Sequence, residues 1–235
     1  MKRLFLLATF AMAVMMAHAQ YFCVSNSAQL HYVNYDEAGQ SESNTTYTVR
    51  NASNSGDSFT VQYIGKTVTN KVRSTTSYSL IDWTYANAVT TCAEDLMYEL
   101  YIAENRIADQ YDEVARMAMH DLRKYEGDNS FVLPDAVTSG QAMKDRSYKY
   151  LKNMFKYDYK ISGAVYLGQE RVSTTAGRYD CLKVSYLKHT KITLKSSSLR
   201  VTEWYAKGIG LVKSVTYDTS GKLKGKTLLV KVTYP

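Results

Sequence analysis

The side chains that could act as a nucleophile and its base are Cys181 and His189, which lie on one C-terminal stretch of the chain. A thiol next to an imidazole can be activated for covalent catalysis. In an exported protein, however, a cysteine on a strand is more often buried or oxidised, and the sequence contains no G-x-S-x-G elbow that would supply a serine nucleophile. We therefore expect no catalytic residues and no enzyme.

A glycine pair, Gly208 and Gly210, raises the question of phosphate binding in the stretch VTEWYAKGIGLVKSVTYD, residues 201–218. A phosphate-binding loop needs a helix directly after its glycines, because the helix N-terminus faces the anion. Residues 211–217 instead show the apolar and polar pattern that is typical of a strand. The glycines are therefore predicted to form a turn between two strands, since glycine readily adopts positive φ, and a further strand is predicted over Lys222–Tyr234.

Metal ligation is the third chemistry to consider. Three histidines lie outside the N-terminal segment: His31, His120 and His189. They form neither an H-E-x-x-H motif nor a cysteine and histidine cluster with metal-binding spacing. An acidic group has helical spacing without the alternating ligands of a calcium loop: Asp109, Asp112 and Glu113. We expect no metal site and no cofactor.

The N-terminus indicates export. Lys2-Arg3 precedes an apolar run from Leu4 to Met16, and Ala17-His18-Ala19 follows it, which is the order of a secretory signal with cleavage after Ala19. No later stretch approaches the roughly 20 apolar residues of a membrane helix, so no membrane span is expected. Cys23 could carry a lipid, but Gln20-Tyr21-Phe22 lacks the small residues that lipid attachment needs. We expect an unlipidated protein in the periplasm or outside the cell.

Charge and length limit the class of protein further. The formal net charge is +7, and removal of Lys2 and Arg3 leaves +7 − 2 = +5. A basic balance can attract nucleic acid, but export and the scattered charges argue against it, so no nucleic-acid partner is expected. Residues 20–235 are long enough to bury a core of their own and are predicted to form one domain after the signal peptide, residues 1–19.

Composition and alternation predict a mainly β fold. The chain has 21 Tyr and 2 Pro, and tyrosine fits the half-buried surface of a sheet. Alternating segments bounded by turn formers predict strands at residues 30–35, 45–50, 58–63, 78–85, 155–161, 165–174 and 179–186. The aromatic and basic residues of Tyr148–Lys160 could form a stacking platform for single-stranded nucleic acid. Because aromatic side chains share one face of 155–161 and lysines the other, an amphipathic strand is the favoured interpretation.

In the middle of the chain the spacing of the apolar residues changes. From Leu96 to Leu122 apolar residues recur at intervals of three and four, which indicates a helix whose apolar side packs on the sheet. Leu96–Tyr101 is also acceptable as a strand, so the helix is predicted only over Glu104–Leu122.

Three stretches carry a resemblance to a known family. TTAGRYDCLKVSY (174–186) and VTEWYAKGIGLVKSVTYDTSGKL (201–223) resemble the C-terminal signature of the TapB-like family of small secreted Bacteroidetes proteins, which is related to a β-rich domain of unknown function. FVLPDAVTSGQAMKD (131–145) is similar to a proline-containing loop of the same family. The resemblance implies one strongly curved antiparallel sheet or partly open β-barrel with one helical excursion, and a strand at Leu96–Tyr101. It implies no catalytic residues, because the family has no established activity.

Three cysteines in an exported chain suggest one disulfide and one remaining thiol. Cys23 lies near the expected mature N-terminus, where a flexible end constrains little. Cys181 stands in the aromatic-Asp-Cys strand of the family signature, and Cys92 stands before the central strand, where related proteins also place a cysteine. The resemblance therefore implies a disulfide between Cys92 and Cys181, and three buried thiols are the alternative.

Two classes of function remain. The first is a binding or carrier module of the cell envelope, in which a curved sheet encloses an apolar small molecule. The second is a structural or interaction module whose sheet is filled by its own side chains and whose surface meets another envelope protein. The first is slightly preferred. A deep apolar cavity would favour it, whereas a filled core with an exposed apolar patch would favour the second.

Overall fold

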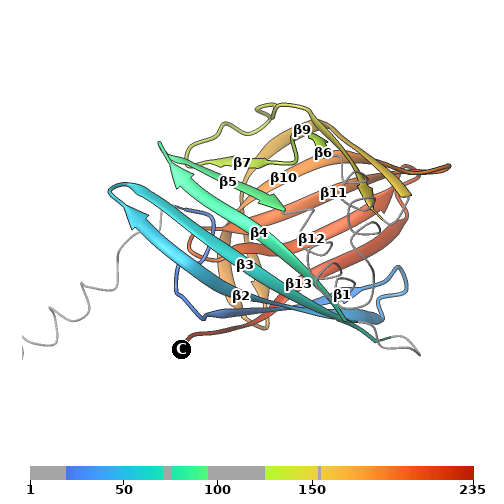
Figure 1. Ribbon diagram of the computed structural model, residues 1–235. Coiled ribbons are helices and arrows are strands. Elements are labelled where there is room, and N and C mark those ends of the chain that lie inside the picture. Colours follow the sequence, from blue (N-terminus) through green and yellow to red (C-terminus); the bar gives the residue numbers. More distant parts are fainter. Residues whose placement is uncertain (1–19, 71–75, 95–124, 153–154) are drawn as a thin grey trace, which may run out of the picture.

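Within residues 20–70, 76–94, 125–152 and 155–235, which the computed structural model describes, 13 strands pair in one antiparallel sheet (Figure 1). The order in the sheet is β6-β8-β9-β10-β11-β12-β13-β1-β2-β3-β4-β5-β7. The strands are β1 (Gln29–Tyr35), β2 (Ser41–Ser55), β3 (Ser58–Thr69), β4 (Thr76–Ala86), β5 (Val89–Glu94), β6 (Tyr125–Gly127), β7 (Phe131–Pro134), β8 (Arg146–Lys152), β9 (Phe155–Thr174), β10 (Gly177–Ile192), β11 (Lys195–Ala206), β12 (Gly210–Asp218) and β13 (Leu223–Thr233).

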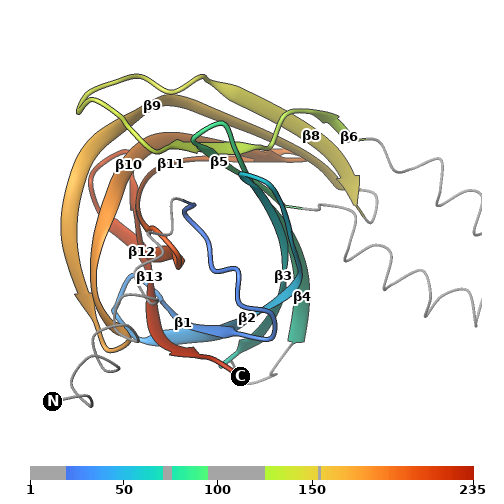
Figure 2. The same cartoon turned by 90° about the vertical axis from the view of Figure 1, so that its left-hand side faces the viewer.

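Most neighbours in the sheet are also neighbours along the chain, because tight turns connect antiparallel strands. The exceptions are β6 with β8, β5 with β7, and β1 with β13, and in the last of these Gln29 lies opposite Thr233. Figure 2 shows that the sheet curls almost into a ring, with β1 to β4 and β8 to β13 around a common interior. The predicted strongly curved antiparallel sheet, a partly open barrel, is thus confirmed.

The end strands β6 and β7 leave the ring open, and a seam runs between β7 and β9. The Tyr166 hydroxyl of β9 donates a hydrogen bond to the carbonyl oxygen of Val132 in β7 at 2.9 Å. The chain that follows β7 returns to β9, where the Met143 N–H donates to the Ala164 carbonyl oxygen at 2.8 Å. Side chains and a loop therefore bridge the seam where strand pairing does not.

The strands predicted from alternation are confirmed, and several are longer than predicted. β9 joins two of them, residues 155–161 and 165–174, into one strand of 20 residues. Its pairing with β10 shifts between Ser185 and Leu187, opposite Gly163, which has a φ of +59°. A bulge of this kind bends a strand and strengthens its twist, which suits a sheet that curls as strongly as this one.

The glycine pair forms the predicted turn. β11 ends at Ala206 and β12 begins at Gly210, and Gly208 and Gly210 have φ values of +72° and +109°. A side chain is rarely compatible with such φ values, which explains glycine at both positions. Since a strand and not a helix follows, the segment has no helix N-terminus to hold a phosphate.

Residues 20–23 run through the interior of the ring (Figure 2). Tyr21, Phe22 and Cys23 are 1%, 0% and 2% exposed. The Tyr21 N–H donates to Thr90 Oγ1 at 3.0 Å, and the Cys23 N–H donates to the Tyr63 hydroxyl. The expectation of a flexible end around Cys23 is therefore wrong, because this segment is part of the core.

Some predictions lie outside the described residues: the signal peptide (1–19), the strand Leu96–Tyr101 and the helix Glu104–Leu122. None of the residues that the structure does describe is helical. Accordingly, no helix among them is long and apolar enough to cross a membrane.

Candidate functional site

The structure does not bring Cys181 and His189 together. Both lie on β10, and a strand advances about 3.3 Å per residue, which separates their Cα atoms by roughly 26 Å. Burial raises the pKa of the Cys181 thiol to about 12, and His189 Nδ1 lies 2.8 Å from Ser198 Oγ. A protonated thiol without a base is a poor nucleophile, so this pair has no catalytic geometry.

The predicted disulfide between Cys92 and Cys181 is absent, because all three cysteines are free thiols. Cys92 lies on β5 and Cys181 on β10, which are not neighbours in the sheet. A disulfide needs Cα atoms within about 7 Å, and a resemblance in sequence cannot supply that distance. Burial raises the pKa of the Cys92 thiol to about 12, so this thiol too keeps its proton.

A carboxyl group in the interior, that of Glu203 on β11, was missed by the sequence analysis. The Tyr205 hydroxyl donates to Glu203 Oε2 at 2.9 Å, and burial raises the pKa of Glu203. The Arg146 guanidinium lies 4.6 Å from the centre of the Phe131 ring and 5.8 Å from that of Tyr186. The only sequence feature that indicates this buried carboxyl group is a glutamate on the apolar face of a strand.

Metal ligands are not gathered in the described part of the chain, which holds no group of three or more His, Cys, Asp or Glu side chains able to bind an ion. His31 Nδ1 lies 3.1 Å from Thr46 Oγ1. His120 and the acidic group, Asp109, Asp112 and Glu113, fall outside the described residues.

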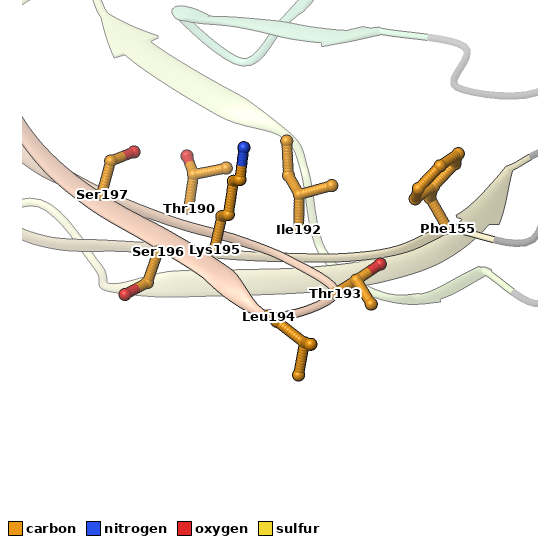
Figure 3. Close-up of a pocket in the computed structure, with 8 residues that line it drawn as sticks. All are labelled: Phe155, Thr190, Ile192, Thr193, Leu194, Lys195, Ser196 and Ser197. Carbon is orange, nitrogen blue, oxygen red and sulfur yellow. The ribbon is translucent and has the colours of Figure 1, made fainter.

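The most unusual surface feature is the end of the β10–β11 hairpin, where Thr193 and Leu194 connect the paired residues Ile192 and Lys195. An open hollow of about 560 Å³ lies against it (Figure 3). Its lining is Phe155, Thr190, Ile192, Thr193, Leu194, Lys195, Ser196 and Ser197. Leu194 is 93% exposed and Phe155 is 53% exposed. Large apolar side chains in these positions lose the stabilisation that burial provides.

Lysines surround this end of the molecule. A second hollow of about 300 Å³ is lined by Lys149, Lys156, Tyr157, Asp158, Lys191 and Thr193. Lys149 Nζ lies 3.7 Å from Asp158 Oδ2. The Thr193 N–H donates to the Lys156 carbonyl oxygen at 2.9 Å, which ties the β10–β11 loop to β9. The two hollows thus belong to one basic and apolar end of the sheet.

The tyrosines of β8 and β9 stack on one another. Ring centres lie 4.7 Å apart for Tyr150 and Tyr157 and 4.8 Å apart for Tyr148 and Tyr159. Lys188 Nζ lies 5.1 Å from the centre of the Tyr159 ring. The described residues therefore bear out an amphipathic strand with its aromatic side chains on one face.

The family model of DUF3108-like proteins matches residues 26–229. The chain belongs to this family. No curated protein matches it significantly. The narrower resemblance to TapB-like proteins stays a prediction, because the match is to the broader β-rich family alone.

Two solved structures are similar to the chain. A candidate exported protein with a YmcC-like fold from Bacteroides fragilis has a TM-score of 0.69 at 16% identity, covering 90% of this chain and 98% of its own. A candidate lipoprotein from Parabacteroides distasonis has a TM-score of 0.68 at 18% identity, covering 91% of this chain and 98% of its own. At these identities the likeness shows the fold.

Proposed function

We propose that the protein is an exported, non-enzymatic module of the cell envelope that acts through its surface, as an interaction partner of other envelope components. The observation that carries this proposal is the burial of residues 20–23 inside the ring. Tyr21 and Phe22 are 1% and 0% exposed inside the ring, and the Phe22 ring packs 5.8 Å from that of Trp83. They occupy the space in which a small barrel would otherwise hold a ligand.

Export is supported by the charged and apolar order of residues 2–19 and by the descriptions of the two similar structures as a candidate exported protein and a candidate lipoprotein. Lipid attachment to this chain would need Cys23 at the surface. Cys23 is 2% exposed, and its N–H and carbonyl groups are both bonded to the Tyr63 hydroxyl. An unlipidated chain beginning at Gln20 therefore agrees better with this fold.

An apolar small molecule is the second candidate partner. The hollow beside Phe155 and Ile192, of about 560 Å³, falls within the roughly 300–1,000 Å³ range of small-molecule sites. A ligand bound there would lie at the end of the β10–β11 hairpin, outside the interior that Tyr21 and Phe22 occupy.

Titration with a fluorescent apolar dye tests the proposal. We expect no saturable one-to-one binding inside the unaltered protein, and binding in the variant Phe22→Ala, which opens an apolar cavity. One-to-one binding by the unaltered protein that persists in both Leu194→Ser and Phe155→Ser would contradict the proposal, because the dye would then occupy an interior site.

A further inference from the structure

The proposed function leaves open which partner the surface meets, and this inference rests on that proposal. The hairpin tip is defined as the three exposed apolar residues of the basic end together with its four lysines: Phe155, Ile192, Leu194, Lys149, Lys156, Lys191 and Lys195. We propose that the hairpin tip docks into the headgroup region of an anionic phospholipid surface.

Apolar exposure at the hairpin tip is the first observation. Leu194 is 93% exposed, Phe155 is 53% exposed and Ile192 is 36% exposed. Single exposed apolar residues are common on proteins. Here, however, the three apolar residues line one hollow at the end of a hairpin. Side chains in this position can enter a lipid layer without any movement of the rest of the fold.

The direction of these side chains favours a bilayer over a protein partner. Figure 3 shows Ile192, Phe155 and Lys195 projecting to one side of the hairpin and Leu194 to the other. A rigid protein surface would cover one side and leave the other in water. A fluid headgroup and acyl-chain region surrounds an inserted tip, so it covers both sides at once.

The charge of the hairpin tip selects anionic lipid. Lys149, Lys156, Lys191 and Lys195 contribute four positive charges, and Asp158 is the one acidic residue lining either hollow. Lysines next to protruding apolar side chains keep their ammonium groups at headgroup level while the apolar groups go deeper. Each lysine close to an anionic surface strengthens binding about fivefold.

The loop between β10 and β11 holds Leu194 in this position. Thr193 has a φ of +53°, a conformation that is unfavourable for a β-branched residue. Its N–H is bonded to Lys156 at 2.9 Å, which fixes the loop against β9. The leucine is therefore presented by an ordered turn, and insertion needs no refolding of the chain.

Co-sedimentation with vesicles tests the proposal. The mature protein is mixed with phosphatidylcholine vesicles that contain either none or about 30% phosphatidylglycerol. We expect binding to the anionic vesicles, weakened by salt. We expect Leu194→Ser to lower the partition coefficient about tenfold, and Lys191→Gln with Lys195→Gln to lower it about 25-fold.

Matched controls carry the same chemical changes elsewhere on the sheet. Leu167→Ser removes a leucine that is 40% exposed on β9, away from the hairpin tip, and Lys231→Gln removes an exposed lysine of β13. Both should bind as the unaltered protein does. Equal losses for control and tip variants would overturn the proposal, as would absence of binding to anionic vesicles.

A depth measurement separates insertion from simple charge attraction. The native tryptophans, Trp83 and Trp204, are each 5% exposed, so a Leu194→Trp variant adds the one lipid-accessible indole of the described residues. Brominated phospholipids should quench it. Binding without quenching would overturn insertion, and retention on an immobilised acidic protein without vesicle binding would assign the tip to a protein partner. The dye titration of the interior can fail or succeed independently of these results.

Discussion

The packing of residues 20–23 inside the ring predicts a large loss of stability when Phe22 is truncated. Phe22 is 0% exposed and its ring centre lies 5.8 Å from that of Trp83. Phe→Ala changes in a core cost about 3–5 kcal/mol of unfolding free energy, since both apolar burial and packing are lost. In a chain of this size each kcal/mol shifts Tm by about 2–4 °C, so Phe22→Ala should lower Tm by roughly 6–20 °C.

Urea unfolding of the mature protein, followed by circular dichroism and tryptophan fluorescence, measures this free energy. The control is Tyr234→Ala, which removes a 56% exposed ring near the C-terminus and should cost about 0.5 kcal/mol or less. If Phe22→Ala does not fold, the milder Phe22→Leu should still lose about 1 kcal/mol. A Phe22→Ala loss no greater than that of the control would refute packing of this segment in the core.

Three further predictions concern the thiols, the interior acid and the N-terminus. Cys23, Cys92 and Cys181 should resist iodoacetamide in the folded protein and all react after unfolding, whereas a linked Cys92–Cys181 peptide would contradict the free thiols. Burial raises the pKa of Glu203 above its ordinary value of 4.5, so its contribution to stability is present below that value and is lost as pH rises through the folded pKa. Glu203→Gln should therefore gain stability relative to the unaltered protein between pH 4 and pH 7 in urea unfolding, and a constant difference would count against a buried acid. Intact mass should show a mature chain that begins at Gln20 and carries no lipid.

The strands were predictable because the alternation of apolar and polar residues indicates that one face of a strand is buried and the other is exposed to solvent. Residues 155–161 illustrate this, since the charged residues Lys156, Asp158 and Lys160 at every second position leave only one register that buries Ile161. The turn at Gly208 and Gly210 was predictable for a related reason, because the residues after it alternate as a strand. The length of β9 was not predictable, because the glycine at the bulge, Gly163, looks in the sequence like the end of a strand.

The sequence did not predict which segments that are distant along the chain lie together in the fold. Gln20–Cys23 has no periodicity and lies next to a predicted cleavage site, so nothing in its composition places it inside a ring that other strands build. Glu203 accepts a hydrogen bond from Tyr205 on its own strand, but its burial depends on how far the sheet curls. The exposure of Leu194 likewise depends on how far β11 extends beyond β12, whose pairing with β11 ends at Leu199 and Asp218.

The central claim is that the interior is filled by the chain itself, so that the protein acts through its surface. Native mass spectrometry of the protein purified from its own host without detergent tests this claim most directly. The predicted result is the mass of the Gln20–Pro235 chain with no small molecule retained. A one-to-one adduct that survives Leu194→Ser and Phe155→Ser would contradict it, because such a ligand would have to lie within the ring that Tyr21 and Phe22 occupy.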